Sequence, residues 1–213
     1  MSIAYSSGTD VGEAGVFGQV MGLVATTLGV FTLGAYLGRH LAGGPSLICF
    51  IIGFGCIFGL NYVRDAGVAA IGLLSAMGLF LGLGLGGGLD AYASSDPGVV
   101  WQAGAATALF VAGLGSIGYM IRSDLSAGYR VLFFLLLGLI VYGLVSLFVS
   151  MPAGNVIYAV LGLVIFGGYT LLDFNRLRNA GPGDAVSIAT GIFLDIVNVF
   201  TFFVQLFGRG QQD

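Results

Sequence analysis

The sequence predicts an all-α protein that crosses a membrane several times. Its mean hydropathy is +1.01 and only 8% of its residues are charged, against roughly 25% in soluble domains. Apolar runs of about 17 to 23 residues recur along the chain, and about 20 residues cross a bilayer as a helix. Because the alternating pattern of a membrane barrel is absent, we expect helices, which satisfy their own backbone hydrogen bonds.

Seven spans are expected, joined by links too short to fold as soluble domains. The spans are residues 16–37, 46–63, 68–89, 99–121, 131–149, 156–172 and 185–207. The sixth can continue as helix past Asp173 to about Arg178, and residues 90–98 are expected to be a link. The chain is therefore one transmembrane domain, residues 16–207, between an N-terminal tail of residues 1–15 and a C-terminal tail of residues 208–213.

The arginines predict the orientation, because the chain contains no lysine. With a cytoplasmic N-terminus, most arginines lie in cytoplasmic links, namely Arg64, Arg122, Arg130, Arg176 and Arg178. Only Arg39 and Arg209 then lie outside. The positive-inside rule favours this arrangement. We expect an integral protein of the bacterial inner (plasma) membrane with its N-terminus in the cytoplasm.

Several function classes are disfavoured. A retinal protein needs a lysine for its Schiff base, and there is none. The single histidine, His40, falls in a link, and no zinc, serine–base or phosphate-loop motif accompanies it. We therefore expect no enzymatic activity, no bound cofactor and no nucleic-acid partner. A proton-coupled transporter stays open as an alternative, because membrane carboxylates often relay protons.

Two carboxylates are the main candidates for function. Asp195 lies inside the apolar run 185–207, where an ionisable side chain is costly unless it faces protein, water, an ion or a partner charge. Asp173 lies at the end of the preceding run, and Asp184, in the turn between the runs, is 11 residues from each. In an antiparallel hairpin the two would lie at similar depth.

Asp195 belongs to a polar stripe on the last span. At 100° per residue from Ser187, the residues Gly191, Asp195, Asn198, Thr201 and Gln205 fall within an arc of ~120°. Lipid would leave these groups unsatisfied, so we expect this helix inside the bundle. Asn198, Gln205 and Ser187 are candidates for lining an ion pathway. Alternatively, Asp195 and Asn198 only make hydrogen bonds between helices.

A close pair of carboxylates predicts a response to pH. The two cannot both ionise cheaply, so they share one proton at lower pH and repel each other while attracting a cation at higher pH. Arg176 and Arg178, if close, would favour the ionised state. Asp173 and Asp195 could bind Ca²⁺ only weakly, since tight sites use six to eight oxygens. Weak binding suits a leak.

The third span carries glycines at four-residue intervals, Gly78, Gly82 and Gly86. Small residues at this spacing allow helix backbones to approach closely. We expect tight packing against another helix. A flexible or pore-lining glycine face is the alternative.

Three segments resemble the Bax inhibitor-1 family (transmembrane Bax inhibitor motif proteins, with bacterial YccA-like members). In residues 191–208, Leu194 and Asp195 are followed by Asn198 and a run of aromatic residues, as in the last helix of the family. Residues 168–175, with Asp173, are similar to the end of its sixth helix. Residues 113–118 and the basic link 122–125 resemble its glycine-rich fourth helix and the segment after it.

The resemblance implies a seven-helix bundle with the last helix at its centre. It also implies a pH-sensitive calcium leak with a role in calcium homeostasis, in which Asp173 and Asp195 sense protons. Some members place an acid and an arginine on the second helix, whereas residues 49–61 here carry no charge. The alternative implied by YccA-like relatives is an interaction protein that modulates a membrane protease or stress-response partner without conducting ions.

Overall fold

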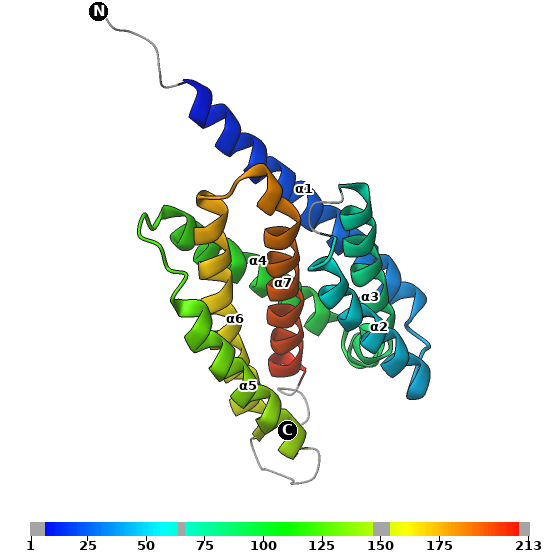
Figure 1. The fold of residues 1–213 in the computed structure, drawn as a ribbon. Coiled ribbons are helices and arrows are strands. Elements are labelled where there is room, and N and C mark those ends of the chain that lie inside the picture. The colour runs from blue at the N-terminus through cyan, green and yellow to red at the C-terminus, as the bar shows by residue number, and fades with distance from the viewer. Residues whose placement is uncertain (1–6, 64–66, 147–153, 209–213) are drawn as a thin grey trace, which may run out of the picture. The chain divides into compact units, whose positions relative to one another are not determined.

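The computed structural model describes residues 7–63, 67–146 and 154–208, and these ranges contain helices and no strand. Figure 1 shows the helices in chain order from blue to red. They are α1 (Ser7–Leu37), α2 (Gly44–Leu60), α3 (Val68–Ser95), α4 (Pro97–Met120), α5 (Gly128–Ser146), α6 (Gly154–Arg178), the 3₁₀ turn η1 (Pro182–Asp184) and α7 (Ala185–Phe207). The predicted all-α fold with seven helices is confirmed.

The chain divides into two compact units. The first comprises Met1–Asp90 and Leu177–Phe193, and the second Ala91–Arg176 and Leu194–Asp213. Helix α7 belongs to both, because its first nine residues lie in the first unit and the remainder in the second.

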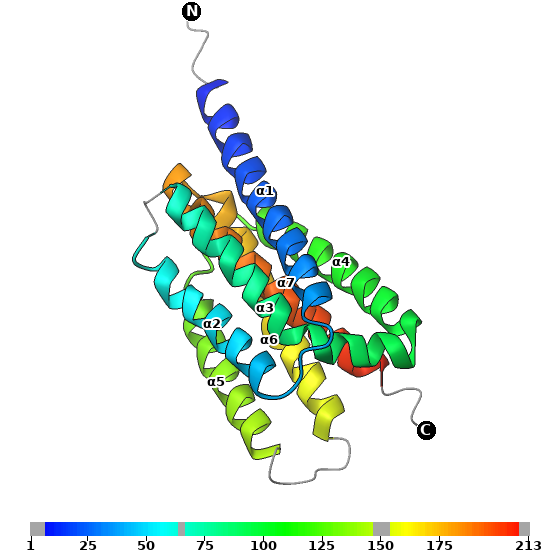
Figure 2. The same cartoon turned by 90° about the vertical axis from the view of Figure 1, so that its right-hand side faces the viewer.

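In the first unit, glycines bring the backbones of α1, α2 and α3 close together, and the three helices lie along one another in Figure 2. A Cβ on Gly78 would lie 2.9 Å from the carbonyl oxygen of Thr27, and one on Gly82 would collide with that of Phe31. Gly84 accepts a 2.6 Å hydrogen bond from the Ser46 hydroxyl on α2. The glycines at positions 78, 82 and 84 of α3 therefore pack against neighbouring helices, which agrees with the expectation of tight packing.

The second unit is built around aromatic and aliphatic side chains. Its core cluster contains residues of α5, α6 and α7, namely Leu139, Ala159, Ile165, Phe166, Val199 and Phe202. The ring of Phe202 lies 5.6 Å from that of Tyr158 and 5.9 Å from that of Phe166. Such edge and tilted contacts suit aromatic quadrupoles and fix the C-terminal half of α7 against α6.

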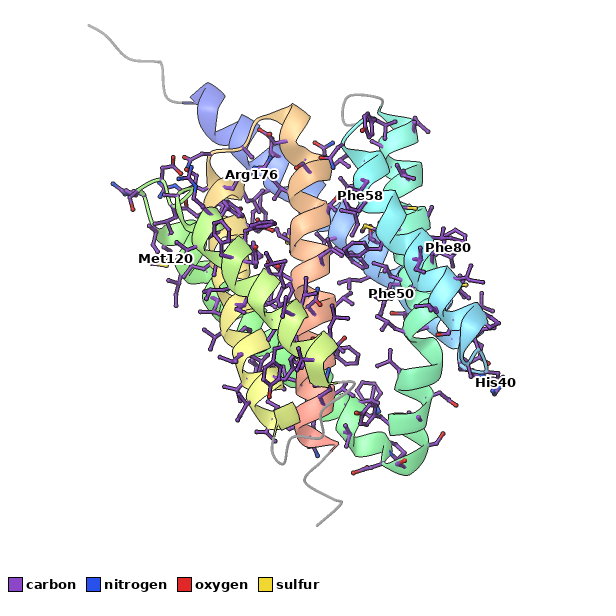
Figure 3. All side chains as sticks on the ribbon, turned by 60° about the horizontal axis from the view of Figure 1, so that its bottom comes forward. His40, Phe50, Phe58, Phe80, Met120 and Arg176 are labelled. Carbon is purple, nitrogen blue, oxygen red and sulfur yellow. The ribbon has the colours of Figure 1, made fainter. Side chains whose placement is uncertain are left out.

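The helices differ in how much of their surface lipid can reach. Half of the most apolar window of α7 is buried, and no residue of α7 is fully exposed. In α5 only 6% of the corresponding window is buried. The exposed faces of other helices are apolar, with Phe50 and Phe58 on α2 labelled in Figure 3. α7 is thus the most buried of the apolar helices that the structure describes, and the exposed apolar faces of the others suit contact with lipid.

Within the described residues, six helices are long and apolar enough to cross a membrane. The remaining apolar helix, α2, has 17 residues, which is ~26 Å of helix and the short end of the spanning range. Together they make the chain an integral membrane protein.

One predicted link is wrong. Residues 90–98 were expected to be a loop, but α3 continues to Ser95 and α4 begins at Pro97. Only Asp96 separates them, and its Oδ1 accepts a 2.7 Å hydrogen bond from the Gly98 amide as the N-cap of α4. The segment lacks an apolar run, yet an aspartate before a proline is a strong signal for a helix start.

Other boundaries differ less. α6 does continue past Asp173 to Arg178, and α5 begins at Gly128, which places Arg130 in its first turn rather than in a link. α1 begins at Ser7, inside the expected tail. Arg64, Arg209 and the end of the fifth predicted span (147–149) lie outside the described residues.

The close approach of α1 and α3 can be tested at Gly82. We expect Gly82→Ala to lower the free energy of unfolding by about 1–3 kcal/mol, because its Cβ would meet the backbone of Phe31 and lie 2.8 Å from the Ala35 nitrogen. Gly88→Ala is the matched control on the same helix, since a Cβ there meets nothing within 4 Å. The measurement is unfolding of purified protein in micelles. Equal midpoints for the two variants would contradict this packing.

Candidate functional site

The two predicted carboxylates lie together in the second unit. Asp173 on α6 is 6% exposed and Asp195 on α7 is 4% exposed. They are close enough to interact electrostatically. Two buried acids of like charge in one place favour sharing a proton over double ionisation.

Asp173 has partners that suit a negative charge. The hydroxyl of Tyr129, in the first turn of α5, donates a hydrogen bond of 2.5 Å to its Oδ1. The guanidinium of Arg176, one turn further along α6 and labelled in Figure 3, interacts with it electrostatically. Both a hydroxyl donor and a nearby cation stabilise a carboxylate anion.

Asp195 has a different environment. Its Oδ2 is buried and has no hydrogen-bond partner among the described residues. The Thr170 hydroxyl on α6 donates a 2.8 Å hydrogen bond to the carbonyl oxygen of Phe166. A buried carboxylate oxygen without a donor is costly as an anion, so the Asp195 environment favours a neutral carboxyl group.

A buried amide holds the neighbouring link. Asn175, 3% exposed, donates from Nδ2 to three main-chain carbonyl oxygens, at 3.3 Å in Gly118, 2.8 Å in Ile121 and 3.1 Å in Ser123. Its Oδ1 accepts from the Leu125 amide at 3.2 Å. These bonds fasten the link between α4 and α5 to α6, and this link leads directly into Tyr129.

Sequence reasoning missed both Tyr129 and Asn175 as parts of the site. Tyr129 lies 44 residues from Asp173 in sequence and Asn175 lies 50 from Leu125. No helical periodicity joins residues so far apart. The only usable signal was Asn175 itself, a polar amide two residues after Asp173 on the same apolar helix.

The other polar residues of α7 make hydrogen bonds within their own helix or lie half-buried. Asn198 donates a 2.7 Å hydrogen bond to the carbonyl oxygen of Leu194, and Thr201 does the same to that of Val197, both within α7. Asn198 and Gln205 are half-buried and follow Asp195 in the second unit, whereas Ser187, also half-buried, belongs to the first unit. The structure thus joins Asp173 with Asp195 within the second unit.

No group of three or more His, Cys, Asp or Glu side chains lies together within the described ranges. A cation near α6 and α7 would therefore rely on the two aspartates with main-chain and amide oxygens. That is the donor set of a weak site for a hard cation rather than of a tight one.

Fold and site together define a class: an integral membrane protein with seven α-helices among its described residues, in which the last and most buried helix carries one of two buried, interacting carboxylates. A family model described as "Inhibitor of apoptosis-promoting Bax1" matches residues 13–212. The chain belongs to the Bax inhibitor-1 family.

Three similar proteins come from bacteria and are described as uncharacterized. An uncharacterized protein of Chlamydia muridarum is 29% identical over 208 residues, which covers 88% of this chain and 84% of the relative. An uncharacterized protein of Deinococcus radiodurans is 36% identical over 104 residues, 44% of this chain and 45% of the relative. An uncharacterized membrane protein of Streptococcus pyogenes is 27% identical over 118 residues, 52% of each. The chain spans about half the length of the last two.

Asn175 can be tested as the clamp of the α4–α5 link. We expect Asn175→Ala to lower the free energy of unfolding by about 1–3 kcal/mol, because buried main-chain groups lose their partners. Asn198→Ala is the control, and its cost should stay below about 1 kcal/mol, because its amide bonds only within its own helix. Unfolding of both variants in micelles is the measurement. A larger effect at Asn198 than at Asn175 would contradict the clamp.

Proposed function

We propose that the protein is a pH-sensitive cation leak, with Ca²⁺ as the favoured ion, and that Asp173 and Asp195 form its gate. The observation that carries the proposal is the burial of these two interacting carboxylates on α6 and α7 of a membrane-spanning protein. Ionisable groups at membrane depth are expensive and mark ion or proton pathways.

The gate works through the number of protons on the pair. With one proton present, the pair carries a single charge and the two helices remain tied. When the last proton leaves, two buried anions repel each other and attract a cation. The leak is then closed at lower pH and open at higher pH.

The proposed ion follows from the donor set. Two carboxylates with amide and main-chain oxygens match a hard cation such as Ca²⁺. Weak binding lets the ion leave again, as conduction requires. Asn198 and Gln205, further along α7, are proposed to line the pathway. The proton and Ca²⁺ are the substrates, the bilayer is the surrounding partner, and no enzymatic step or bound cofactor is proposed.

A role in calcium homeostasis at a bacterial inner membrane fits such a leak, and all the relatives above are bacterial. We propose that the N-terminus is cytoplasmic. Arg122, in the link after α4, and Arg178, at the end of α6, then lie on the cytoplasmic side.

The gate can be tested with purified protein in liposomes. We expect Ca²⁺ influx to rise between about pH 6 and pH 8 in the wild type, the range in which a coupled buried pair can exchange its proton. Asp195→Asn and Asp173→Asn should abolish the dependence on pH, because a single carboxylate has no partner with which to share a proton. Asp124→Asn, an exposed aspartate in the α4–α5 link, is the matched control and should behave as the wild type.

Two results would overturn the proposal. Influx that is absent from the wild type at every pH would favour the alternative of an interaction protein that modulates a membrane protease or stress-response partner. Influx whose pH response survives both substitutions would show that another group is the gate.

The orientation has its own test. We expect a C-terminal alkaline phosphatase fusion to be active in bacterial cells and a C-terminal green fluorescent protein fusion to be dark. Seven crossings from a cytoplasmic N-terminus place the C-terminus outside. The opposite pair of signals would reverse the proposed topology.

A further inference from the structure

We propose that Tyr129 is the positioning residue of the gate: its hydroxyl holds Asp173 as the hydrogen-bonded anion, so that Asp195 carries the proton exchanged with solution. The inference rests on the proposed gate and adds a third member from a different helix. It makes the two carboxylates unequal, which the burial of the pair alone does not.

The first step is the bond itself. The Tyr129 hydroxyl donates to Asp173 Oδ1 at 2.5 Å. A hydroxyl proton bonds more strongly to a carboxylate anion than to the carbonyl oxygen of a neutral acid. The positive charge of Arg176 acts in the same direction on Asp173. Both groups that face Asp173 from α5 and α6 therefore favour its charged form.

The second step is the contrast with Asp195. The groups that face Asp195 are Asp173, Tyr169 and Thr170, all on α6, and the more distant Tyr129. The negative charge of Asp173 opposes a second charge here. The Oδ2 of Asp195 is buried without a hydrogen-bond donor among the described residues, so a negative charge on it would be uncompensated. A neutral Asp195 avoids this cost.

The third step is the placement of Tyr129. Its ring centroid lies 6.1 Å from that of Tyr169 on α6. The preceding link is fastened to α6 through Asn175, which bonds to Ile121, Ser123 and Leu125. Tyr129 is thus held by the ring of Tyr169 and by the fastened link, independently of its hydrogen bond to Asp173. A side chain held in this way keeps its hydrogen bond with little loss of rotamer freedom.

The consequence is that one hydroxyl group decides which carboxylate carries the shared proton. Tyr129 stabilises the anion on Asp173 in both states of the gate, so the proton that leaves at higher pH leaves from Asp195. Without that hydroxyl group, Asp173 competes for the proton.

The deciding experiment is infrared spectroscopy of the purified protein, titrated with pH, which reports the carbonyl stretching band of a protonated carboxylic acid and does not need conduction. In the Asp195→Asn variant only Asp173 remains of the pair. We expect Tyr129→Phe in this background to raise the pH at which the band disappears by about one to two units, because the Asp173 anion loses a charge-assisted hydrogen bond. Tyr158→Phe in the same background is the matched control: Tyr158 is a half-buried tyrosine of the same unit whose hydroxyl makes no hydrogen bond within the described residues.

The single variants provide a second readout. At neutral pH we expect the band to be present in Asp173→Asn and absent from Asp195→Asn, because Asp195 carries the exchanged proton.

Each outcome decides one question. A rise in the pH at which the band disappears that Tyr129→Phe causes and Tyr158→Phe does not, together with the expected pattern in the single variants, supports the assignment. In a protein without influx the same result means that only the leak fails. A Tyr129→Phe variant that titrates like Tyr158→Phe overturns the assignment. So does a band that is absent from Asp173→Asn and present in Asp195→Asn at neutral pH.

Discussion

The free-energy cost of charge away from water is the constraint on which this structure depends. Inside the spans, hydroxyl groups avoid that cost by donating to the carbonyl oxygen one turn earlier, as Thr107 and Thr170 do. Asp173 avoids it through Tyr129 and the nearby Arg176. Among the described residues, the buried side-chain atom left without a partner is Oδ2 of Asp195. Such an atom in an otherwise satisfied interior is a reason to look for a proton or an ion there.

The packing of the neighbouring helices keeps the two carboxylates buried and close together. In the second unit, Gly118 lets α4 approach the backbone of α6 at Leu171, close to Asp173 in the chain. The Asn175 amide closes the end of the same region by binding the link after α4. Rigid close packing of this kind limits the ways in which two carboxylates can avoid each other. Binding one proton then relieves the repulsion between the two carboxylates at the lowest cost in free energy.

The chain belongs to the Bax inhibitor-1 family, but the groups around Asp173 differ from those that the resemblance implied. Residues 49–61, in α2 and just after it, contain no charged side chain. The partners of Asp173 that the structure describes come instead from α5 and α6, in the form of Tyr129 and Arg176. A neutral hydroxyl donor holds a carboxylate more weakly than an arginine does, since it brings no charge. A gate built in this way is tuned by hydrogen bonds as well as by charge.

The sequence by itself determined the membrane surroundings, the number of helices and the burial of the last helix. Hydropathy and length decide the first two, and the stripe through Asp195 decides the third, because a polar face cannot meet lipid. Helix α3 shows the limit of hydropathy: its last turn is too polar to count as a span, yet the cap at Asp96 makes it helix up to Ser95. The capping signal at Asp96 is local and visible in the sequence, but the polar composition of residues 90–98 led to the prediction of a loop.

Only the tertiary structure decided which groups surround each carboxylate. Tyr129 and Asn175 reach their partners across 44 and 50 residues of chain, and such contacts depend on how helices pack rather than on any repeat in the sequence. The sequence shows Asp173 and Asp195 as two similar acids. Their difference, one with a hydroxyl donor and one without a partner for Oδ2, arises because α5 and α6 place donors on one side of the pair alone.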